Sequence, residues 1–196
     1  MNTLQNAGLE VTGGFIVGFD NDPSSIFESQ VEFIQRSGIV TAMVGLLTAL
    51  PDTKLYQRLH HENRILKPST GDNTDFTVNF VPKMKSEELI KGYTKLLTSI
   101  YSPKAYYARV KTFLREYNQT PRKRNPMIFN YMLAIVKSFF YIGFWNRSGF
   151  RFWNLFFWTI FKRPGLFANS ITFTIYGFHF RKIIKLNLKW LISAGV

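Results

Sequence analysis

The residues best suited to contact a ligand surround one short apolar run near the start of the chain. This run, residues 15–17, lies between Gly14 and Gly18 and is followed by Asp20 and Asp22. An apolar run bounded by glycines and followed by a helix start predicts a buried parallel strand that leads into a βα turn. Ligands of α/β folds bind at the carboxyl ends of such strands, and glycines let them approach the backbone. A core strand that has glycines at its ends and binds no ligand fits the same pattern, and the pattern alone favours it.

The two acids after the run have structural as well as functional interpretations. We expect Asp22 to cap a helix that begins at Pro23, and Ser25 with Glu28 offers an alternative capping box. Asp20 fits a ligand-facing acid and a solvated turn residue equally well.

Side chains that hold metals or perform acid–base chemistry are scarce. Among 196 residues there is no cysteine, and histidine occurs three times. This composition excludes a disulfide scaffold, a thiolate-held zinc ion and a cysteine-ligated iron–sulfur cluster within this chain. His60 and His61 are neighbours on an expected helix, where adjacent side chains point apart. We therefore predict no metal site and no catalytic acid, base or nucleophile in this chain.

Two motifs carry a resemblance to radical S-adenosylmethionine enzymes. Residues 14–21 read Gly-Phe-Ile-Val-Gly-Phe-Asp-Asn and resemble the Gly-x-Ile-x-Gly-x-x-Glu motif on the fifth barrel strand of that family. Asn21 stands where the family often has glutamate. Residues 40–56 resemble the sixth strand and its exit, which commonly ends Pro-Gly-Thr-x-Leu-Tyr, and Asp52 stands where glycine is common. Aspartate tolerates tight turns, so this departure is a mild one.

The chain also resembles a C-terminal extension of cobalamin-dependent members of that family, which include hopanoid methylases. The similar residues are 71–75 and 79–84. The resemblance implies an α/β fold that supplies the last two strand–helix units of a partial TIM-type barrel, followed by an all-α, aromatic and basic extension. The implied parts are the barrel portion 1–80, an amphipathic helical pair 81–118, a basic linker 119–126 and a basic aromatic helical extension 127–196.

The resemblance assigns binding roles to two groups of residues. In the family the fifth strand lies under the adenine of S-adenosylmethionine, which implies contacts by Gly14, Ile16 and Gly18. Leu47 and Thr48, near the end of the sixth strand, are weaker candidates for the same cofactor. A polar loop is a weak candidate for facing the substrate through Asn73, Thr74 and Asp75.

The implied chemistry needs parts that this chain lacks. In the family a reduced four-iron four-sulfur cluster cleaves S-adenosylmethionine to a 5′-deoxyadenosyl radical, and cobalamin relays a methyl group in the cobalamin-dependent methyltransferases. The cluster is held by a Cys-x3-Cys-x2-Cys loop near the first barrel strand, and neither that loop nor any cysteine is present here. The implied partner is therefore an N-terminal barrel and cobalamin-binding part. We expect this chain to be a C-terminal fragment that is inert alone.

Charge divides the chain into two unlike parts. Residues 1–116 carry 13 Lys or Arg and all 12 Asp and Glu, whereas residues 117–196 carry 12 Lys or Arg and no acid. Tryptophan interleaved with basic residues is typical of the headgroup zone of membranes. An anionic membrane surface is therefore favoured over a solvated helical cap, and nucleic acid is not favoured. We expect a cytoplasmic location, with peripheral attachment to the inner face of the membrane left open. The alternative function is a non-enzymatic basic module that binds a membrane surface or a partner chain.

Overall fold

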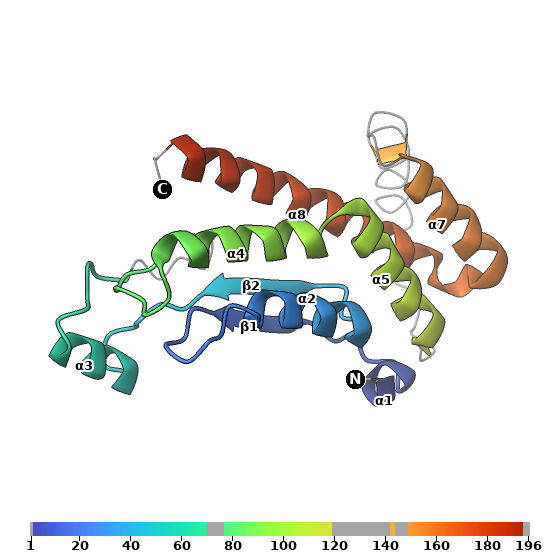
Figure 1. Ribbon diagram of the computed structural model, residues 1–196. Helices are drawn as coiled ribbons and strands as arrows, with labels where there is room; N and C mark the ends of the chain where they lie inside the picture. The colour runs from blue at the N-terminus through green and yellow to red at the C-terminus, as the bar shows by residue number, and fades with distance from the viewer. Residues whose placement is uncertain (1, 70–76, 119–141, 144–148, 194–196) are drawn as a thin grey trace.

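The computed structural model describes residues 2–69, 77–118, 142–143 and 149–193 (Figure 1). These residues are mostly helical and contain one small parallel sheet. The elements, in chain order, are α1 (Asn2–Asn6), β1 (Gly13–Val17), α2 (Ile26–Ser37), β2 (Ala42–Leu46), α3 (Lys54–His61), α4 (Ser86–Ile100), α5 (Pro103–Glu116), α7 (Gly149–Lys162), the 3-10 turn η2 (Pro164–Leu166) and α8 (Phe167–Ser193).

β1, α2 and β2 form a βαβ unit. The strands pair in parallel, with Gly13 opposite Ala42 and Val17 opposite Leu46. The helix between them ends at Gly38, whose φ of 69° lies in the left-handed region that glycine adopts without strain. The α/β character predicted from the sequence is confirmed by this two-stranded sheet. The described residues contain no further strand of a barrel.

The helices cover one face of the sheet. Phe27 and Ile34 of α2 are buried there, together with Leu89, Leu96 and Ile100 of α4. Figure 1 shows α4 lying between the sheet and α8. The alternation of buried and exposed residues along both strands follows from this one-sided cover.

Two tyrosines, Tyr93 of α4 and Tyr101 at its C-cap, close the outer edge of β2. The Tyr93 hydroxyl donates a hydrogen bond to the Val44 carbonyl at 2.8 Å, and the Tyr101 hydroxyl donates to the Ala42 carbonyl at 2.8 Å. Burial raises the pKa of Tyr101 to about 12, so this hydroxyl keeps its proton and remains a donor near neutral pH. These carbonyls point away from β1, at the edge where a further strand would otherwise pair.

A buried arginine of α5 extends the same edge. Arg109 is 1% exposed and donates to the Val40 carbonyl at 3.3 Å, to the Ile100 carbonyl at 3.0 Å and to the Gln35 side chain. Its guanidinium also lies 5.9 Å from the centre of the Tyr101 ring. The helical spacing of residues 106, 110, 113, 114 and 117 predicts an apolar stripe that leaves Arg109 mostly outside it. Arg109 is nevertheless buried, because backbone and amide oxygens of several elements accept its hydrogen bonds.

The basic C-terminal helices pack on α4 and α5 and share their core. The Tyr106 hydroxyl donates to the Phe173 carbonyl of α8 at 2.7 Å, and the guanidinium of Arg181 lies 6.0 Å from the centre of the Tyr106 ring. Gly177 faces that ring so closely that a Cβ there would overlap it. One cluster of buried residues runs from Val17 in β1 to Ile184 in α8.

Two expected helix boundaries differ from the observed ones. α2 begins at Ile26, and Ser25 occupies the N-cap position without a side-chain hydrogen bond, so neither the Asp22 cap nor the capping box forms. The apolar residues at 55, 56, 59 and 65 predict a helix that extends through Ile65. α3 ends earlier, at His61, and Ile65 forms an antiparallel bridge with Phe80. The expected helices at 102–117 and 150–161 are confirmed as α5 and α7.

Part of the sequence-based predictions lies outside the described residues. This applies to the linker 119–126, to the helix expected at 127–145 and to Asn73, Thr74 and Asp75. Within the part of the chain that is described, no helix combines the length and the apolar character needed to cross a membrane.

The tyrosine contacts at the β2 edge predict a specific loss of stability. Tyr101→Phe leaves the buried carbonyl of Ala42 without its donor, and we expect the free energy of unfolding to fall by about 1–3 kcal/mol. Urea denaturation followed by circular dichroism measures this change. Tyr176→Phe, at a tyrosine that is 43% exposed, is the matched control and should change stability by less than about 0.5 kcal/mol. Equal effects of the two variants would contradict the edge contact.

Candidate functional site

The face of the sheet opposite the helices is uncovered within the described part of the chain. Gly14 and Ile16 of β1 and Met43 and Gly45 of β2 present this face. Ile16 is 50% exposed and Met43 is 61% exposed. Large apolar side chains on a central strand are normally covered, so this face is the first candidate for a binding surface.

The uncovered face carries two open hollows. The register places Gly14 beside Met43 and Ile16 beside Gly45, so each glycine neighbours a large side chain of the other strand. No atom lies within 4 Å of the position that a Cβ would occupy on Gly14 or on Gly45. A flat apolar group can therefore approach the backbone here and pack between Ile16 and Met43.

The turn after β1 is fixed by a carboxylate. One oxygen of Asp22 accepts hydrogen bonds from the backbone N–H groups of Gly18 at 2.8 Å and of Phe19 at 3.0 Å. Gly18 has a φ of 103°, a conformation that L side chains rarely adopt. Asp22 thus stabilises the turn in place of capping α2. Gly18 has a conformational role at the end of the strand, where an added Cβ would meet Leu89 at 3.4 Å.

Asp20 is the centre of an ion-pair cluster at the carboxyl end of β1. Its side chain is 7% exposed and contacts Arg64 through both oxygens, at 2.6 and 2.9 Å, and Arg58 of α3 at 3.0 Å. Arg64 also pairs with Glu62 at 2.7 Å. Figure 1 shows α3 beyond the carboxyl ends of both strands, so this cluster attaches α3 and the following segment to the end of the sheet.

The two arginines determine the charge state of Asp20. The hydrogen bonds from Arg64, and then the positive charges of Arg64 and Arg58, hold the pKa of Asp20 below its ordinary value despite its burial. Asp20 is therefore an anion at neutral pH and is already paired on both oxygens. This arrangement favours a structural role over the ligand-facing role that the sequence left open.

An asparagine fixes the segment after β2. The Asn79 side chain donates to the Ala49 carbonyl and accepts from the Ala49 N–H, both at 2.8 Å, so it pairs with the backbone as a neighbouring strand does. Leu47 is 8% exposed and packs in a small core with Leu59 and Phe80. Thr48 is half-buried.

The five cofactor candidates from the sequence are thus brought to different places. Gly14 and Ile16 lie on the uncovered face, Gly18 forms the turn, and Leu47 is buried away from solvent. Sequence reasoning missed Met43 and Gly45, which share the face with the first two. Their signal was the period-two alternation of the second strand, in which positions 43 and 45 lie on one face.

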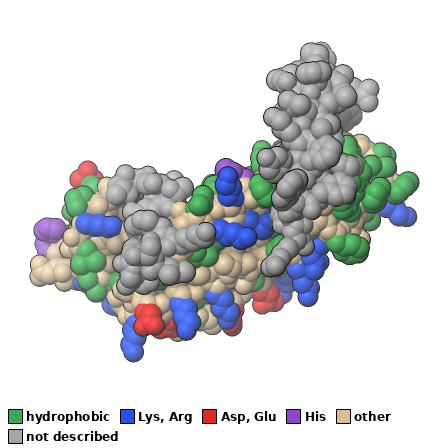
Figure 2. All heavy atoms as spheres, turned by 90° about the horizontal axis from the view of Figure 1, so that it is seen from above, with side chains coloured by type: hydrophobic (Ala, Val, Ile, Leu, Met, Phe, Trp, Pro, Cys, Tyr) green, Lys and Arg blue, Asp and Glu red, His purple; other side chains and the backbone are tan. Residues whose placement is uncertain are grey.

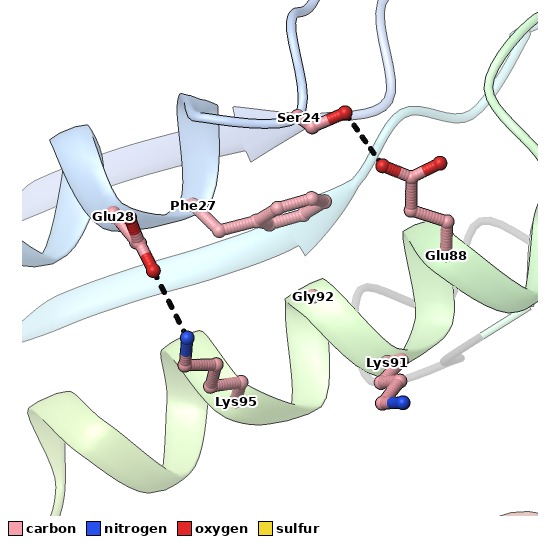
Figure 3. A pocket seen from close by; sticks show the side chains of 7 residues that line it. All are labelled: Ser24, Phe27, Glu28, Glu88, Lys91, Gly92 and Lys95. Atoms are coloured by element: carbon pink, nitrogen blue, oxygen red, sulfur yellow. Dashed lines mark hydrogen bonds and ion pairs between the residues drawn. The ribbon is translucent and has the colours of Figure 1, made fainter.

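Apart from the two hollows on the uncovered face, a pocket lies on the helical side of the molecule, between α2 and α4 (Figure 3). It has a volume of about 220 Å³ and forms because Gly92 lets the Phe27 ring pack against α4. Ser24 donates to Glu88 at 2.6 Å and Lys95 pairs with Glu28 at 3.0 Å across it. Because these groups satisfy one another, this pocket is a weaker ligand candidate than the uncovered face.

The described residues also contain no group of three or more His, Cys, Asp or Glu side chains placed to hold a metal ion. The arrangement of Ile16 and Met43 around the two glycines can bind and orient a flat apolar group.

Comparisons with known proteins show where related sequences occur. Residues 53–190 match a family model described as a domain of unknown function, DUF4070. An uncharacterized methyltransferase of Synechocystis sp. is 32% identical over 193 residues, which cover 94% of this chain and 36% of that protein. The hopanoid C-2 methylase of Rhodopseudomonas palustris is 30% identical over 109 residues, covering 56% of this chain and 20% of that protein.

A third relative is the bacteriochlorophyllide d C-12(1)-methyltransferase of Chlorobaculum tepidum. It is 26% identical over 112 residues, which cover 57% of this chain and 24% of that protein. This chain therefore spans little more than a third, or less, of the length of these relatives. No solved structure matches the chain.

The Asp20 cluster predicts a pH-dependent contribution to stability. Asp20→Asn removes the charge that Arg64 and Arg58 share, and we expect the free energy of unfolding at pH 7 to fall by about 3 kcal/mol. Because the pKa of Asp20 is lowered in the folded state, its contribution is complete above the unfolded pKa of about 3.9 and is lost as the pH falls through the lower folded pKa. Urea denaturation at pH 7, 4 and 3 should show the two proteins converging towards acid pH.

Glu28→Gln is the matched control for the charge change. Glu28 and its partner Lys95 are 75% and 69% exposed, so their ion pair should contribute less than about 1 kcal/mol. A difference between Asp20→Asn and the original protein that stayed constant down to pH 3 would contradict the ion-pair account.

Proposed function

Because the chain belongs to the DUF4070 family, which forms the C-terminal region of cobalamin-binding radical S-adenosylmethionine methylases, we propose that it supplies one wall of an S-adenosylmethionine site in such an enzyme. In this proposal the uncovered face of the β1–β2 sheet lies towards the inside of a barrel. The helices α2 and α4 form part of its outer layer. The relatives are named as methylases or methyltransferases, and methyl transfer is the reaction that we propose for the whole protein.

The observation that carries the proposal is the open pair of glycines on the uncovered face. A barrel of parallel strands has helices outside and side chains or ligands inside. The helices here cover one face only, and the opposite face offers Gly14 and Gly45 with free space above both. Ile16 and Met43 flank that space and suit an adenine ring, which has two flat faces that pack well on apolar groups.

The two edges of the sheet support a further strand on one side only. Gly13 donates to Thr41 and Val17 accepts from Leu47, so Gly14 and Ile16 turn their backbone groups away from β2. On that outer edge the described residues supply the Ile16 carbonyl with one donor, the Gln30 side chain, at 3.0 Å. The outer edge of β2 is instead occupied by side chains of α4 and α5. We infer that the remaining strands of the barrel are added at β1.

The fit of this chain to the implied cofactors differs from group to group. The uncovered face fits the adenine part of S-adenosylmethionine, which supplies the methyl group when it is bound. The chain has no cysteine, so it does not fit a cysteine-held cluster, and another segment or chain has to supply that half of the site. The residues of this chain act by binding and orienting: Ile16 and Met43 hold the ring, and Asp22 fixes the turn beside it.

The coding sequence immediately upstream provides the first test. We expect it to encode, in the same frame or nearly so, a Cys-x3-Cys-x2-Cys loop within an α/β barrel sequence, because the open edge of β1 needs strands that are not found among the described residues. Sequencing the upstream region and its transcript shows whether the Cys-x3-Cys-x2-Cys loop is encoded there. An unrelated gene that ends at its own terminator there would contradict the proposal that this chain completes a barrel.

Filling one hollow tests the role of the uncovered face. Gly14→Val adds a β-branched side chain where there is free space, so the strand should tolerate it. In the protein together with its cysteine-bearing part, we expect the Kd for S-adenosylmethionine to rise at least about tenfold, which corresponds to about 1.4 kcal/mol. Isothermal titration calorimetry measures the Kd, and circular dichroism checks that the fold is retained.

Ser29→Val is the matched control for this experiment. It adds the same side chain at an exposed position of α2, on the helical side of the sheet, and should leave the Kd unchanged. If Gly14→Val bound S-adenosylmethionine as tightly as the control, the adenine contact would be wrong, while membership of the family would still stand.

A further inference from the structure

The outward face of α7 is apolar, which is the reverse of an ordinary surface helix. Phe150 is 83% exposed, Phe157 is 50% exposed and Phe161 is 78% exposed. These residues are spaced by seven and four positions and therefore lie on one stripe of the helix. The opposite stripe, with Phe152 and Leu155, is buried against the rest of the molecule. The helix is thus apolar on both sides, and one side lacks cover.

The uncovered stripe borders a shallow groove of about 520 Å³. Two tryptophans, Trp153 and Trp158, stand in its lining, and Lys111 of α5 and Lys162 of α7 contribute to it as well. Figure 2 shows hydrophobic side chains gathered at the end of the molecule that α7 forms, with basic side chains beside them. We refer to Phe150, Trp153, Phe157, Trp158 and Phe161 as the α7 aromatic face.

Basic groups surround the α7 aromatic face without acidic neighbours on its own helix. The ammonium of Lys111 lies 5.0 Å from the centre of the Trp158 ring, and the guanidinium of Arg115 lies 5.7 Å from it. Burial, and then the charge of Arg115, lowers the pKa of Lys111, as expected where cations crowd together. No Asp or Glu occurs anywhere in residues 117–196. An anion is therefore the partner that this rim favours.

Arg163 shows that the orientation of α7 is fixed. Its guanidinium donates to the carbonyls of Arg115 and Tyr117 at the end of α5. The carboxyl end of α7 is therefore attached to α5, and the aromatic face lies on the side of the helix that is exposed.

We propose that the α7 aromatic face docks on the surface of an anionic lipid bilayer. The exposed phenylalanines enter the acyl boundary, the two indoles lie at the level of the headgroups, and the basic rim pairs with lipid phosphates. Exposed aromatic rings bordered by Lys111, Arg115 and Lys162, on a helix that carries no acid, match this chemistry better than they match a protein surface, which carries both signs of charge. This inference does not depend on the proposed S-adenosylmethionine site.

Vesicle sedimentation of the full chain tests the proposal. Vesicles of phosphatidylglycerol and phosphatidylcholine in equal parts should bind the protein at least about tenfold more strongly than vesicles of phosphatidylcholine alone, and salt should weaken the binding. The double variant Phe157→Ser with Phe161→Ser should lower binding to the anionic vesicles at least about tenfold, because it removes apolar area that enters the bilayer. A blue shift of tryptophan fluorescence on binding reports burial of the indoles.

A control variant removes exposed apolar side chains from other elements, so that the contribution of the α7 aromatic face can be distinguished. Phe33→Ser with Leu66→Ser removes side chains that are 49% and 64% exposed on other elements, and it should bind vesicles as the original chain does. Unchanged binding by the Phe157 and Phe161 variant, or equal binding to anionic and neutral vesicles, overturns the proposal. Self-association that the same variant abolishes, in a protein that ignores vesicles, would instead assign the face to a second copy of the chain.

Discussion

The hydrogen bonds at the outer edge of β2 determine where the sheet ends and how the helices lie along it. Three successive outward carbonyls, those of Val40, Ala42 and Val44, accept hydrogen bonds from side chains of α4 and α5. An open strand edge normally recruits another strand, and side-chain donors satisfy it without one. The sheet can therefore end at β2, and the helices that supply these donors are aligned along it.

Arg109 shows what this arrangement requires energetically. A fully buried guanidinium is costly unless its N–H groups find acceptors, and among the described residues those acceptors are two backbone carbonyls and an amide oxygen. Burial lowers the pKa of Arg109, but an ordinary value above about 12 leaves it charged near neutral pH. Backbone oxygens and the faces of Tyr101 and Tyr106 stabilise that charge. Because these partners come from separate elements, the charge holds together the sheet, α4 and α5.

The sequence predicted those features of the fold and site that local pattern controls. The glycine-bounded run became β1, and Asp52, which stands where glycine is common in the resembling family, adopts a φ of 64° in the left-handed region that a tight turn requires. What it missed involves partners distant in sequence. Ile65 left its expected helix to pair with Phe80, and Arg109 was buried by oxygens of other elements. Met43 and Gly45 form the other half of the uncovered face. They were identified from the strand register, which places them beside Gly14 and Ile16.

The sheet and the α7 aromatic face lie towards different ends of one continuous core. Their positions determine how attachment of α7 to a bilayer would act on the uncovered face of the sheet. Figure 1 shows α3 at the end of the molecule away from α7, with α4, α5 and α8 between them. Those three helices share a single buried cluster with the sheet, and such a core transmits displacement as a rigid unit and deforms little. Attachment of α7 to a bilayer would therefore set the direction in which the uncovered face points, without changing the hollows at Gly14 and Gly45. Docking would then fix the orientation of the uncovered face relative to the membrane. A substrate held in that membrane would approach the uncovered face along a restricted path.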